Sequence, residues 1–397
     1  MADDGPLSRD NRLDLLRTEL DAIDARIVES LADRLRVIGV IAAFKETQPD
    51  QVRDDAREQA LLERLQALAK ELRLDPHFVE RLFREIIDHS VRRQQEHLLA
   101  RERGATDESL VVGYQGTDGA WGHIAARRHF GARPVEVEYR SFETFGQTLE
   151  AVRDGVVHFA LVPIENTTAG SINEVYDLLA HLDVALVGEE IQLVEHCLLA
   201  LEEVPLARIR RILSHPQAIA QCATFLAGLP HCHVESFANT ALAARKVRQD
   251  QDLSQAAIGS EEAGRIWGLQ VVARGINNQR ENYTRFVVVG PRSLPCDPRI
   301  ACKTSLIFTT RHEQGALVSC LNVLARHGLN LTKLESRPKP GSPWEYVFYV
   351  DFEGNLRDAA TDAALREMTA HVLSLKVLGC YPARVARRSA ATSSQSV

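Results

Sequence analysis

Apolar side chains follow the spacing of an α-helix through the first hundred residues. Over residues 12–45 an apolar residue recurs every three or four positions with no proline, and Pro49 follows. This spacing predicts one long amphipathic helix that ends before the proline. Similar spacing predicts a second helix over 54–72, and an Asp-Pro pair predicts the start of a third over 75–101. With connections this short, the stripe on the first helix predicts a partner chain that covers it.

Short apolar runs replace the helical spacing after a polar stretch at 104–109. Helical patterns separate these runs, and such alternation is typical of an α/β fold with buried strands and crossover helices. The span up to Pro291 is long enough for two α/β lobes with a cleft between them. The expected strands are Leu110–Val112, Phe159–Val162, Val184–Val187, Cys197–Ala200 and Phe286–Val289.

Three prolines, at 291, 295 and 298, mark a linker before the last part of the chain. Beyond them the pattern predicts the βαββαβ order of a ferredoxin-like domain. The expected bounds are 303–310, 316–327, 329–335, 345–351, 358–374 and 377–381. We therefore predict a multidomain α and α/β protein with an all-helical domain at 9–103, a two-lobed α/β domain at 109–291, a ferredoxin-like domain at 302–383 and a disordered tail at 384–397.

The amino-acid composition excludes some classes of protein and leaves the predicted division into domains unchanged. The 397 residues are 45% hydrophobic and 25% charged with a net charge of −7, values of a soluble globular protein and not of a general nucleic-acid binder. The acidic, polar start and the lack of a bilayer-length apolar run lead us to expect a cytoplasmic protein without a membrane segment, its seven cysteines reduced. We expect no cofactor because GxGxxG is missing, and His231-Cys232-His233 offers too few ligands for a metal.

Charged and polar side chains share faces of the predicted helices. Arg34 and Lys45 are eleven residues apart, about three turns, so both project from nearly the same face. Residues 54, 57 and 58 share a face of the second helix, and residues 90 and 94 share one of the third. These positions fit either a solvated face of ion pairs or a cationic pocket for an anion.

The stretches LRTELDAID, LADRLRVIG, VRDDAREQALLERL and IIDHSVRRQQ resemble the all-helical chorismate mutases that are fused to prephenate dehydratase, the bacterial P-proteins. The resemblance implies that the pocket binds chorismate and rearranges it to prephenate. This pericyclic step needs a held conformer and hydrogen-bond donors, but no acid, base or nucleophile. The implied binding residues are Arg17, Arg34, Lys45, Asp54, Arg57, Glu58, Ser90 and Gln94. Of these, the expected catalytic groups are Arg34, Lys45, Glu58 and Gln94.

The first helix also predicts an assembly. Arg17 and Arg34 are separated by roughly 25 Å at about 1.5 Å per residue, so one chain cannot place both on one small substrate. If both are ligands, Arg17 comes from a second subunit. We therefore expect a homodimer, or a higher homo-oligomer, with interlocked helices.

Four stretches of the middle domain resemble the prephenate dehydratases: Tyr114-Gln115-Gly116 with His123, VPIENTTAGSINEVYDLL, SHPQA and NYTRF. The resemblance implies loss of carbon dioxide and hydroxide from prephenate to give phenylpyruvate, with Thr284 as the hydrogen-bond donor to the leaving hydroxyl. The implied prephenate-binding residues are Glu165, Asn166, Thr167, Ser171, Ser214, Gln221 and Arg285. Ser171 is expected at a helix N-terminus, where a carboxylate binds favourably.

One position departs from the dehydratase pattern. The family has a serine or threonine where this chain has Gly122, and Trp121 replaces an aromatic residue that is usually smaller. A hydroxyl that often faces the substrate is therefore missing. The departure keeps open an alternative substrate, arogenate, which is the transaminated relative of prephenate.

The C-terminal pattern resembles the ACT domain of the same proteins. The matching motifs are Gly315-Ala316-Leu317-Val318 at the first helix and Glu335-Ser336-Arg337-Pro338 after the second strand. The resemblance implies that these residues bind phenylalanine, which then inhibits the dehydratase. We predict a bifunctional enzyme of phenylalanine biosynthesis. Two alternatives stay open: a mutase fused to an arogenate dehydratase, and a phenylalanine-sensing regulatory protein with inactive lobes.

Overall fold

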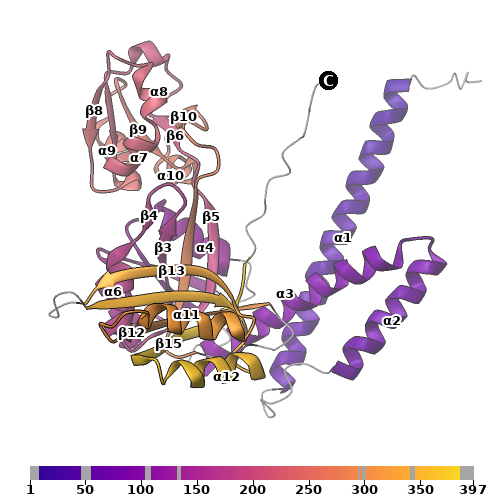
Figure 1. The fold of residues 1–397 in the computed structure, drawn as a ribbon. Helices are drawn as coiled ribbons and strands as arrows, with labels where there is room; N and C mark the ends of the chain where they lie inside the picture. The colour runs from indigo at the N-terminus through magenta and orange to yellow at the C-terminus, as the bar shows by residue number, and fades with distance from the viewer. Residues whose placement is uncertain are drawn as a thin grey trace, which may run out of the picture. The chain divides into compact units, whose positions relative to one another are not determined.

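The computed structural model describes residues 9–45, 55–102, 109–131, 136–293, 296, 301–339 and 345–384. The chain divides into two compact units, Met1–Leu99 and Ala100–Val397, and many of their helices and strands are labelled in Figure 1. Among the described residues, every helix is too short or too polar to span a lipid bilayer.

The described part of the first unit consists of helices. They are α1 (Arg9–Lys45), α2 (Asp55–Glu71) and α3 (Pro76–Glu102), so the three predicted helices are confirmed with slightly shifted ends. Asp75 caps α3, because its Oδ1 accepts a hydrogen bond from the backbone N–H of His77 at 3.0 Å. The buried apolar side chains of this unit lie on α2 and α3: Leu62, Ala69, Ile87 and Val91.

The apolar stripe of α1 lies at the surface of this unit along its first half. Leu16, Leu20 and Ile27 keep 56%, 58% and 53% of their surface exposed. Large apolar side chains that repeat along one exposed helix are typical of a surface that associates with another. The exposure fits the expectation of a partner chain.

The second unit begins with a six-stranded sheet of order β2-β1-β3-β11-β5, in which β4 pairs with β3 off this path. β1 is parallel to β2 and β3, whereas β11 runs antiparallel between β3 and β5. The apolar runs did not predict this mixture, because they carry no strand direction. The elements are β1 (Ser109–Gln115), α4 (Trp121–Phe130), β2 (Glu136–Phe142), α5 (Phe145–Arg153), β3 (Phe159–Asn166), β4 (Gly170–Ser171), α6 (Asn173–His181), β5 (Ala185–Leu193) and β11 (Tyr283–Gly290).

A second, five-stranded sheet has the order β10-β6-β9-β7-β8. The chain enters it through residues 194–196 and leaves it through 274–282, before β11 returns to the first sheet. The second lobe is therefore an insertion between β5 and β11. Its elements are β6 (Cys197–Ala200), η1 (Leu206–Arg208), β7 (Arg211–Ser214), α7 (Pro216–Gln221), α8 (Ala223–Ala227), β8 (His233–Ser236), α9 (Thr240–Asp250), β9 (Gln255–Gly259), α10 (Glu261–Trp267) and β10 (Gln270–Ala273).

The last sheet is antiparallel, with the order β13-β14-β12-β15. Along the chain its elements are β12 (Cys302–Thr310), α11 (Ala316–Arg326), β13 (Asn330–Pro338), β14 (Tyr346–Glu353), α12 (Ala359–Met368) and β15 (Val372–Pro382). The predicted succession of strands and helices is confirmed. Two boundaries were wrong: the helix expected to reach residue 374 ends at Met368, and the strand expected from residue 377 begins at Val372, because Val372 and Leu375 already pack into the core beneath this sheet.

Side chains of the last sheet alternate between two cores. Leu306 and Phe308 of β12 pack with α11 and α12, while Ile307 between them packs into the core of the first sheet together with Tyr349 and Tyr381. This alternation is what the two faces of a strand require. The last sheet is thus covered by its own helices on one face and by β5 and α6 on the other.

A glycine permits the closest part of this contact. A Cβ built on Gly379 of β15 would lie 2.0 Å from the carbonyl oxygen of Leu186 in β5, so a larger residue would push the two backbones apart. Lys376 strengthens the same contact. Its Nζ donates to the carbonyl oxygens of Leu179 and Leu182 at 3.0 Å and 2.8 Å, at the C-terminal end of α6.

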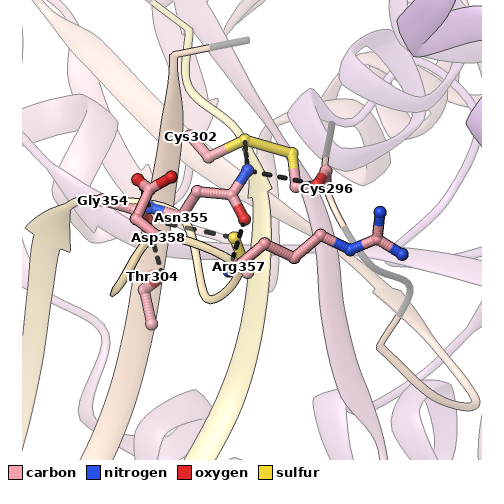
Figure 2. Close-up of a disulfide and its surroundings, with 8 residues drawn as sticks. Cys296, Cys302, Thr304, Gly354, Asn355, Arg357 and Asp358 are labelled. Carbon is pink, nitrogen blue, oxygen red and sulfur yellow. Dashed lines mark hydrogen bonds between the residues drawn. A yellow bond between two sulfur atoms is a disulfide. The ribbon is translucent and has the colours of Figure 1, made fainter. Parts of the chain in front are cut away.

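Cys296 and Cys302 form a disulfide, which Figure 2 shows beside Asn355. Asn355 Nδ2 donates to the carbonyl oxygen of Cys296 at 3.2 Å and contacts Cys302 Sγ at 3.5 Å. The expectation that all seven cysteines are reduced is therefore wrong for this pair. The buried Cys380 has its sulfur within 4.8 Å of theirs. Sequence spacing did not reveal the pair, because the fold and not a CxxC motif brings these sulfurs together.

Candidate active sites

The helical unit brings together two of the residues predicted to bind chorismate. Arg34 of α1 donates from Nη1 to Ser90 Oγ of α3 at 2.9 Å. Ser90 is buried, and its hydroxyl donates to the carbonyl oxygen of Ile86 at 2.7 Å. Burial lowers the pKa of Arg34, but a guanidinium stays charged throughout the range in which proteins fold. A fixed cation therefore lies between two helices, as a carboxylate-binding pocket requires.

The other predicted residues of this pocket are spread over the unit. Arg57 is exposed and Glu58 half-buried on α2. Arg17 is exposed on α1 and forms an ion pair with Asp14 at 3.1 Å. Because α1 is continuous, Arg17 lies about 25 Å from Arg34 along the helix axis. The structure does not describe the side chains of Lys45, Asp54 and Gln94.

In the second unit, the motifs predicted for prephenate lie on the adjacent strands β3 and β11. Asn166 is paired with Thr284, and Glu165 is paired with Arg285. Successive side chains of a strand point to opposite faces, so the two pairs lie on opposite sides of the sheet. We call these sides the neutral face (Asn166 and Thr284) and the charged face (Glu165 and Arg285). The predicted prephenate-binding set is therefore divided between two faces.

On the neutral face, Asn166 is the centre of a buried hydrogen-bond network. Its Nδ2 donates to Thr284 Oγ1 and to Asn282 Oδ1, both at 2.9 Å. Its Oδ1 accepts from the backbone N–H groups of Thr168 and Ala169 at 3.0 Å and 2.9 Å, which fixes the direction of the amide. Because Thr284 Oγ1 receives a hydrogen bond, its own proton can be donated to another acceptor.

A cavity of about 350 Å³ lies beside this network. Gln221 of α7 donates from Nε2 to Thr168 Oγ1 at 2.6 Å and accepts at Oε1 from Asn282 Nδ2 at 3.3 Å. The described residues that line the cavity are uncharged: Thr168, Ala169, Gln217, Ala220, Gln221, Asn277, Asn278, Gln279 and Asn282. Such a lining can hold an anion through amide and hydroxyl donors.

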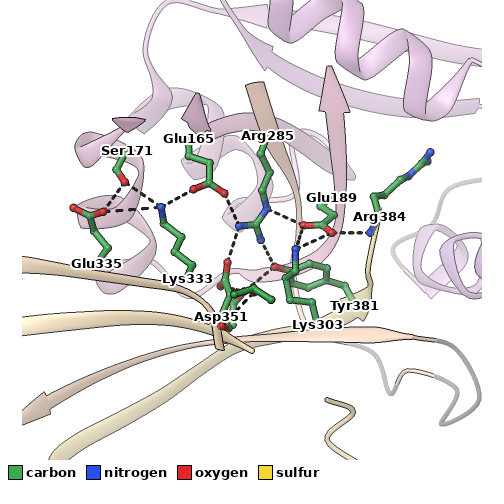
Figure 3. A network of polar contacts seen from close by, with 12 residues as sticks. Glu165, Ser171, Glu189, Arg285, Lys303, Lys333, Glu335, Asp351, Tyr381 and Arg384 are labelled. Carbon is green, nitrogen blue, oxygen red and sulfur yellow. Dashed lines mark hydrogen bonds and ion pairs between the residues drawn. The ribbon is translucent and has the colours of Figure 1, made fainter. Parts of the chain in front are cut away.

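On the charged face, Arg285 is enclosed by carboxylates (Figure 3). Its Nε donates to Glu189 at 2.7 Å, and its Nη1 donates to Glu165 at 2.9 Å and to Asp351 at 2.6 Å. Its Nη2 donates to the hydroxyl of the buried Tyr381 at 2.9 Å. Asp351 and Tyr381 belong to the last sheet. Every nitrogen of this guanidinium is thus engaged within the protein, at the contact between two sheets.

Two lysines of the last sheet extend the charged face. Lys303 Nζ donates to both oxygens of Glu189, at 3.0 Å and 2.9 Å, and Lys333 Nζ donates to Glu165 at 2.6 Å. Burial alone would raise the pKa of Glu165, but hydrogen bonds from Lys333 and Arg285 outweigh burial and lower this pKa. The carboxylate therefore stays charged at neutral pH.

Residues that were predicted for two different ligands meet beside this network. Ser171 Oγ, predicted for prephenate, donates to Glu335 Oε2 at 2.6 Å, and Glu335 was predicted for phenylalanine. Arg337, also predicted for phenylalanine, binds Asp177 of α6 at 2.9 Å. The expected position of Ser171 was wrong: it lies in β4, because α6 begins only at Asn173.

The remaining predicted residues have other surroundings. Thr167 is exposed, and its Oγ1 accepts from the backbone N–H of Tyr283 at 2.9 Å. Ser214 is buried and donates to the carbonyl oxygen of Ile258 at 2.7 Å, so its hydroxyl stabilises the second sheet. In the last sheet Gly315, with φ of 80°, precedes α11. Its motif continues with Ala316, Leu317 and Val318 in α11, while Ser336 and Pro338 are exposed on β13.

Gly122 lies close to the backbone of β1, and its neighbour Trp121 contacts a residue that the sequence did not reveal. A Cβ on Gly122 would lie 3.2 Å from the carbonyl oxygen of Gln115, closer than ordinary contact. The ring of Trp121 meets the ring of His196 edge-on, with centroids 6.0 Å apart. His196 also contacts Gln221. A single histidine within an apolar run carries no motif, so nothing in the sequence distinguished it.

Two family descriptions match the chain in succession. Residues 16–95 match chorismate mutase type II, and residues 112–293 match prephenate dehydratase. The bifunctional chorismate mutase/prephenate dehydratase of Escherichia coli (strain K12) is 40% identical over 377 residues, which cover 95% of this chain and 97% of that protein. This chain belongs to the bifunctional chorismate mutase/prephenate dehydratase family. A relative with the same description from Aquifex aeolicus (strain VF5) is 31% identical over 372 residues, 92% of this chain and 97% of that one.

Solved structures are similar to about 70% of the chain. The prephenate dehydratase from Arthrobacter aurescens, solved in complex with L-Phe, is 28% identical with a TM-score of 0.63, covering 70% of this chain and 93% of that one. GqqA, described as a quorum quenching acylase, is 33% identical with a TM-score of 0.63, covering 69% of this chain and 98% of that one. The predicted family is confirmed, and the neutral face lies within the dehydratase match.

Proposed function

We propose that this chain converts chorismate to prephenate in its helical unit and prephenate to phenylpyruvate in its second unit. The succession of a mutase match and a dehydratase match supports both activities. The observation that carries the dehydratase assignment is the Asn166–Thr284 hydrogen bond beside an uncharged cavity. It leaves the Thr284 hydroxyl able to donate a hydrogen bond to the leaving hydroxyl of the substrate.

The mutase reaction depends on the conformation in which the pocket holds its substrate. Chorismate must be held in a compact conformer while negative charge develops on its ether oxygen. Arg34, fixed against Ser90, is the proposed ligand of a substrate carboxylate. Lys45 and Gln94 are the proposed donors to the ether oxygen, and Glu58 the proposed acceptor from a substrate hydroxyl. The other proposed pocket residues are Arg17, Asp54 and Arg57.

The same unit supports a homodimer. Arg17 is too far along α1 to meet a substrate bound at Arg34 of its own chain, and the exposed stripe of α1 gives a partner helix a surface to cover. Refolding a mixture of Arg17→Ala and Arg34→Ala chains tests this arrangement. Hybrid dimers should recover mutase activity, since one of their two sites would be intact. Failure of any mixture to recover activity would contradict shared sites.

The dehydratase reaction breaks two bonds at one ring. The carboxylate on the ring leaves as carbon dioxide, its bonding electrons make the ring aromatic, and the ring hydroxyl leaves with its electron pair. Thr284 is proposed to donate a hydrogen bond to this hydroxyl, which departs as hydroxide and takes a proton from solvent to become water. A threonine hydroxyl is too weak an acid to give up its proton alone, so its role is polarisation. The amide of Gln221 is the proposed donor to a substrate carboxylate, while both amide hydrogens of Asn166 are used within the protein and orient Thr284.

The last sheet is proposed to be an ACT domain that binds phenylalanine. Numbered within the domain, its strands lie in the order 2-3-1-4 with two helices on one face, which is a ferredoxin-like arrangement. A relative of the dehydratase part was solved with L-Phe. Calorimetric titration with phenylalanine, and its effect on dehydratase rate, test this for wild type and Glu335→Ala. Unchanged affinity and inhibition in the variant would contradict the assignment of Glu335.

Thr284→Val tests the dehydratase proposal, with Thr284→Ser as its matched control. Removing a single donor aimed at developing charge lowers kcat by about 10²–10³-fold, and the serine variant should retain most of the rate. The mutase rate of the same preparations serves as an internal standard. Formation of phenylpyruvate from prephenate, compared with phenylalanine from arogenate, identifies the substrate. A wild-type rate in Thr284→Val would overturn the role of the hydroxyl.

A further inference from the structure

His196 lies in the short connection between β5 and β6 and is 2% exposed. Its backbone is held on both sides, because its N–H donates to Asn277 Oδ1 at 2.7 Å and its carbonyl oxygen accepts from Ile276 N–H at 3.1 Å. The ring places Nε2 at 2.9 Å from Gln221 Oε1. Its Nδ1 is buried without a hydrogen-bond partner among the described residues. This imidazole therefore has one polar contact, and that contact is to a residue of the cavity.

The neighbours of Gln221 determine which atom carries the proton. Gln221 Oε1 accepts from Asn282 Nδ2, and Gln221 Nε2 donates to Thr168 Oγ1. A reversed amide would set its own NH2 group against that of Asn282. Since Oε1 can only accept, the proton of His196 lies on Nε2 and the lone pair lies on Nδ1. Burial lowers the pKa of His196, although the hydrogen bond with Gln221 opposes this, so the ring is neutral.

Hydrogen bonds continue in one direction from this ring to the reacting hydroxyl. His196 donates to Gln221, whose Nε2 donates to Thr168 Oγ1. Thr168 then donates to Asn166 Oδ1 at 2.6 Å, and Asn166 Nδ2 donates to Thr284 Oγ1 at 2.9 Å. Each acceptor in this series thus receives a hydrogen bond from the side of His196. The hydrogens that the series leaves to donate are the second hydrogen of Gln221 Nε2 and the proton of Thr284.

We propose that His196 is a positioning residue for the dehydration of prephenate, which orients Gln221 so that the cavity presents hydrogen-bond donors to the substrate. His196 itself does not line the cavity, and it acts through Gln221. A position that only filled space would be satisfied by an apolar side chain, without the cost of burying Nδ1 unpaired. The inference deepens the proposed dehydratase function and rests on it.

The test compares two substitutions that separate hydrogen bonding from packing. His196→Gln keeps an N–H group near the position of Nε2 but loses the ring that Trp121 contacts. His196→Phe keeps the ring but loses the N–H group. If the hydrogen bond matters, kcat/KM for prephenate falls by up to about tenfold in His196→Phe and less in His196→Gln, because one hydrogen bond contributes about 0.5–1.5 kcal/mol. If only packing matters, the order is reversed, and the proposal is overturned.

A double substitution shows whether His196 acts through Gln221. The variant His196→Phe/Gln221→Ala should be no slower than Gln221→Ala alone, since the residue to be oriented is already gone. Losses that multiply would show that His196 acts by another route and would overturn the proposal. Mutase rate standardises the enzyme amount, and near-ultraviolet circular dichroism reports folding of the second unit. A wild-type enzyme without dehydratase activity would instead contradict the proposed function itself.

Discussion

The neutral face and the charged face belong to the same two strands, yet they use polar side chains in different ways. On the neutral face, hydrogen bonds join Asn166, Thr168 and Gln221 beside a cavity, and the proton of Thr284 is left to donate. On the charged face, every nitrogen of Arg285 is engaged by Glu165, Glu189, Asp351 or Tyr381. The neutral face leaves the proton of Thr284 for a ligand, whereas each nitrogen of Arg285 already donates to a group of the protein.

The NYTRF motif contains one residue of each face, and the structure gives these two residues different roles. Thr284 and Arg285 are neighbours in the chain, and both were predicted to act on prephenate. In the structure, the threonine lies on the neutral face and accepts from Asn166, whereas the arginine links the first sheet to the last. Substitutions on the neutral face should therefore change rates, whereas substitutions on the charged face should change stability. Four predictions test this division, beginning with the one that should have the largest effect.

Replacing Arg285 should destabilise the second unit severely. Arg285→Met leaves Glu189 and Asp351 buried without their shared cation, and breaking a buried ion pair costs about 3–5 kcal/mol. Urea unfolding followed by fluorescence measures this cost. In preparations that remain folded, the KM for prephenate should stay near the wild-type value, because Arg285 faces away from the cavity. A large rise in the KM for prephenate without a loss of stability would instead show that Arg285 contacts the substrate.

Lys333→Met should have an intermediate effect on the free energy of unfolding. The substitution removes hydrogen bonds to Glu165 and Ser171, and hydrogen bonds to charged groups contribute about 1.5–3 kcal/mol. Lys339→Met is the matched control, because Lys339 pairs with Glu345 at 2.8 Å in the same strand region but is 40% exposed. The control should cost about 0–1 kcal/mol. Equal losses of unfolding free energy in both variants would show that Lys333 stabilises the protein no more than an exposed lysine does.

Gly379→Ala should weaken the contact of the two sheets by forcing their backbones apart. The added Cβ would meet the carbonyl oxygen of Leu186, and overpacking of this kind costs about 1–3 kcal/mol. Gly146→Ala, in the helix α5, is the control, since its nearest neighbour atom lies 3.7 Å from an added Cβ. That change should be neutral or stabilising. A thermal shift that is the same for both variants would contradict a tight contact at Gly379.

Acid should weaken the charged face through Glu165. Its pKa is lowered in the folded state, so the stabilisation is fully present above the pKa of the unfolded chain, about 4.3. It is lost as the pH falls through the lower folded-state pKa. Between neutral pH and acid, wild type should therefore lose more stability than Glu165→Gln. Glu138→Gln, at an exposed position, should keep the wild-type pH dependence; parallel curves for all three proteins would rule out this role of Glu165.

The sequence predicted the elements well and the partners of individual side chains poorly. Apolar spacing is a local property, so it gave α1, β3 and β11 to within a few residues. Because the last of these strands was expected to begin only at Phe286, the sequence did not separate Thr284 from Arg285, and both were assigned to prephenate. Apolar spacing could not predict that Asp351 and Tyr381 would contact Arg285, because those residues belong to a sheet whose strands follow β11 in the sequence. His196 was missed for the same reason, since Gln221 and Asn277 are distant in sequence.

The placement of β11 has a consequence for how this protein is made. β3 and β5 do not pair with each other, because β11 lies between them and bonds to both. A ribosome finishes the whole inserted lobe before it reaches β11, and until then both strands present open edges. Open edges in a nascent chain invite wrong pairing. Slow translation or a destabilised inserted lobe should therefore lower the yield of soluble enzyme before it changes any rate constant.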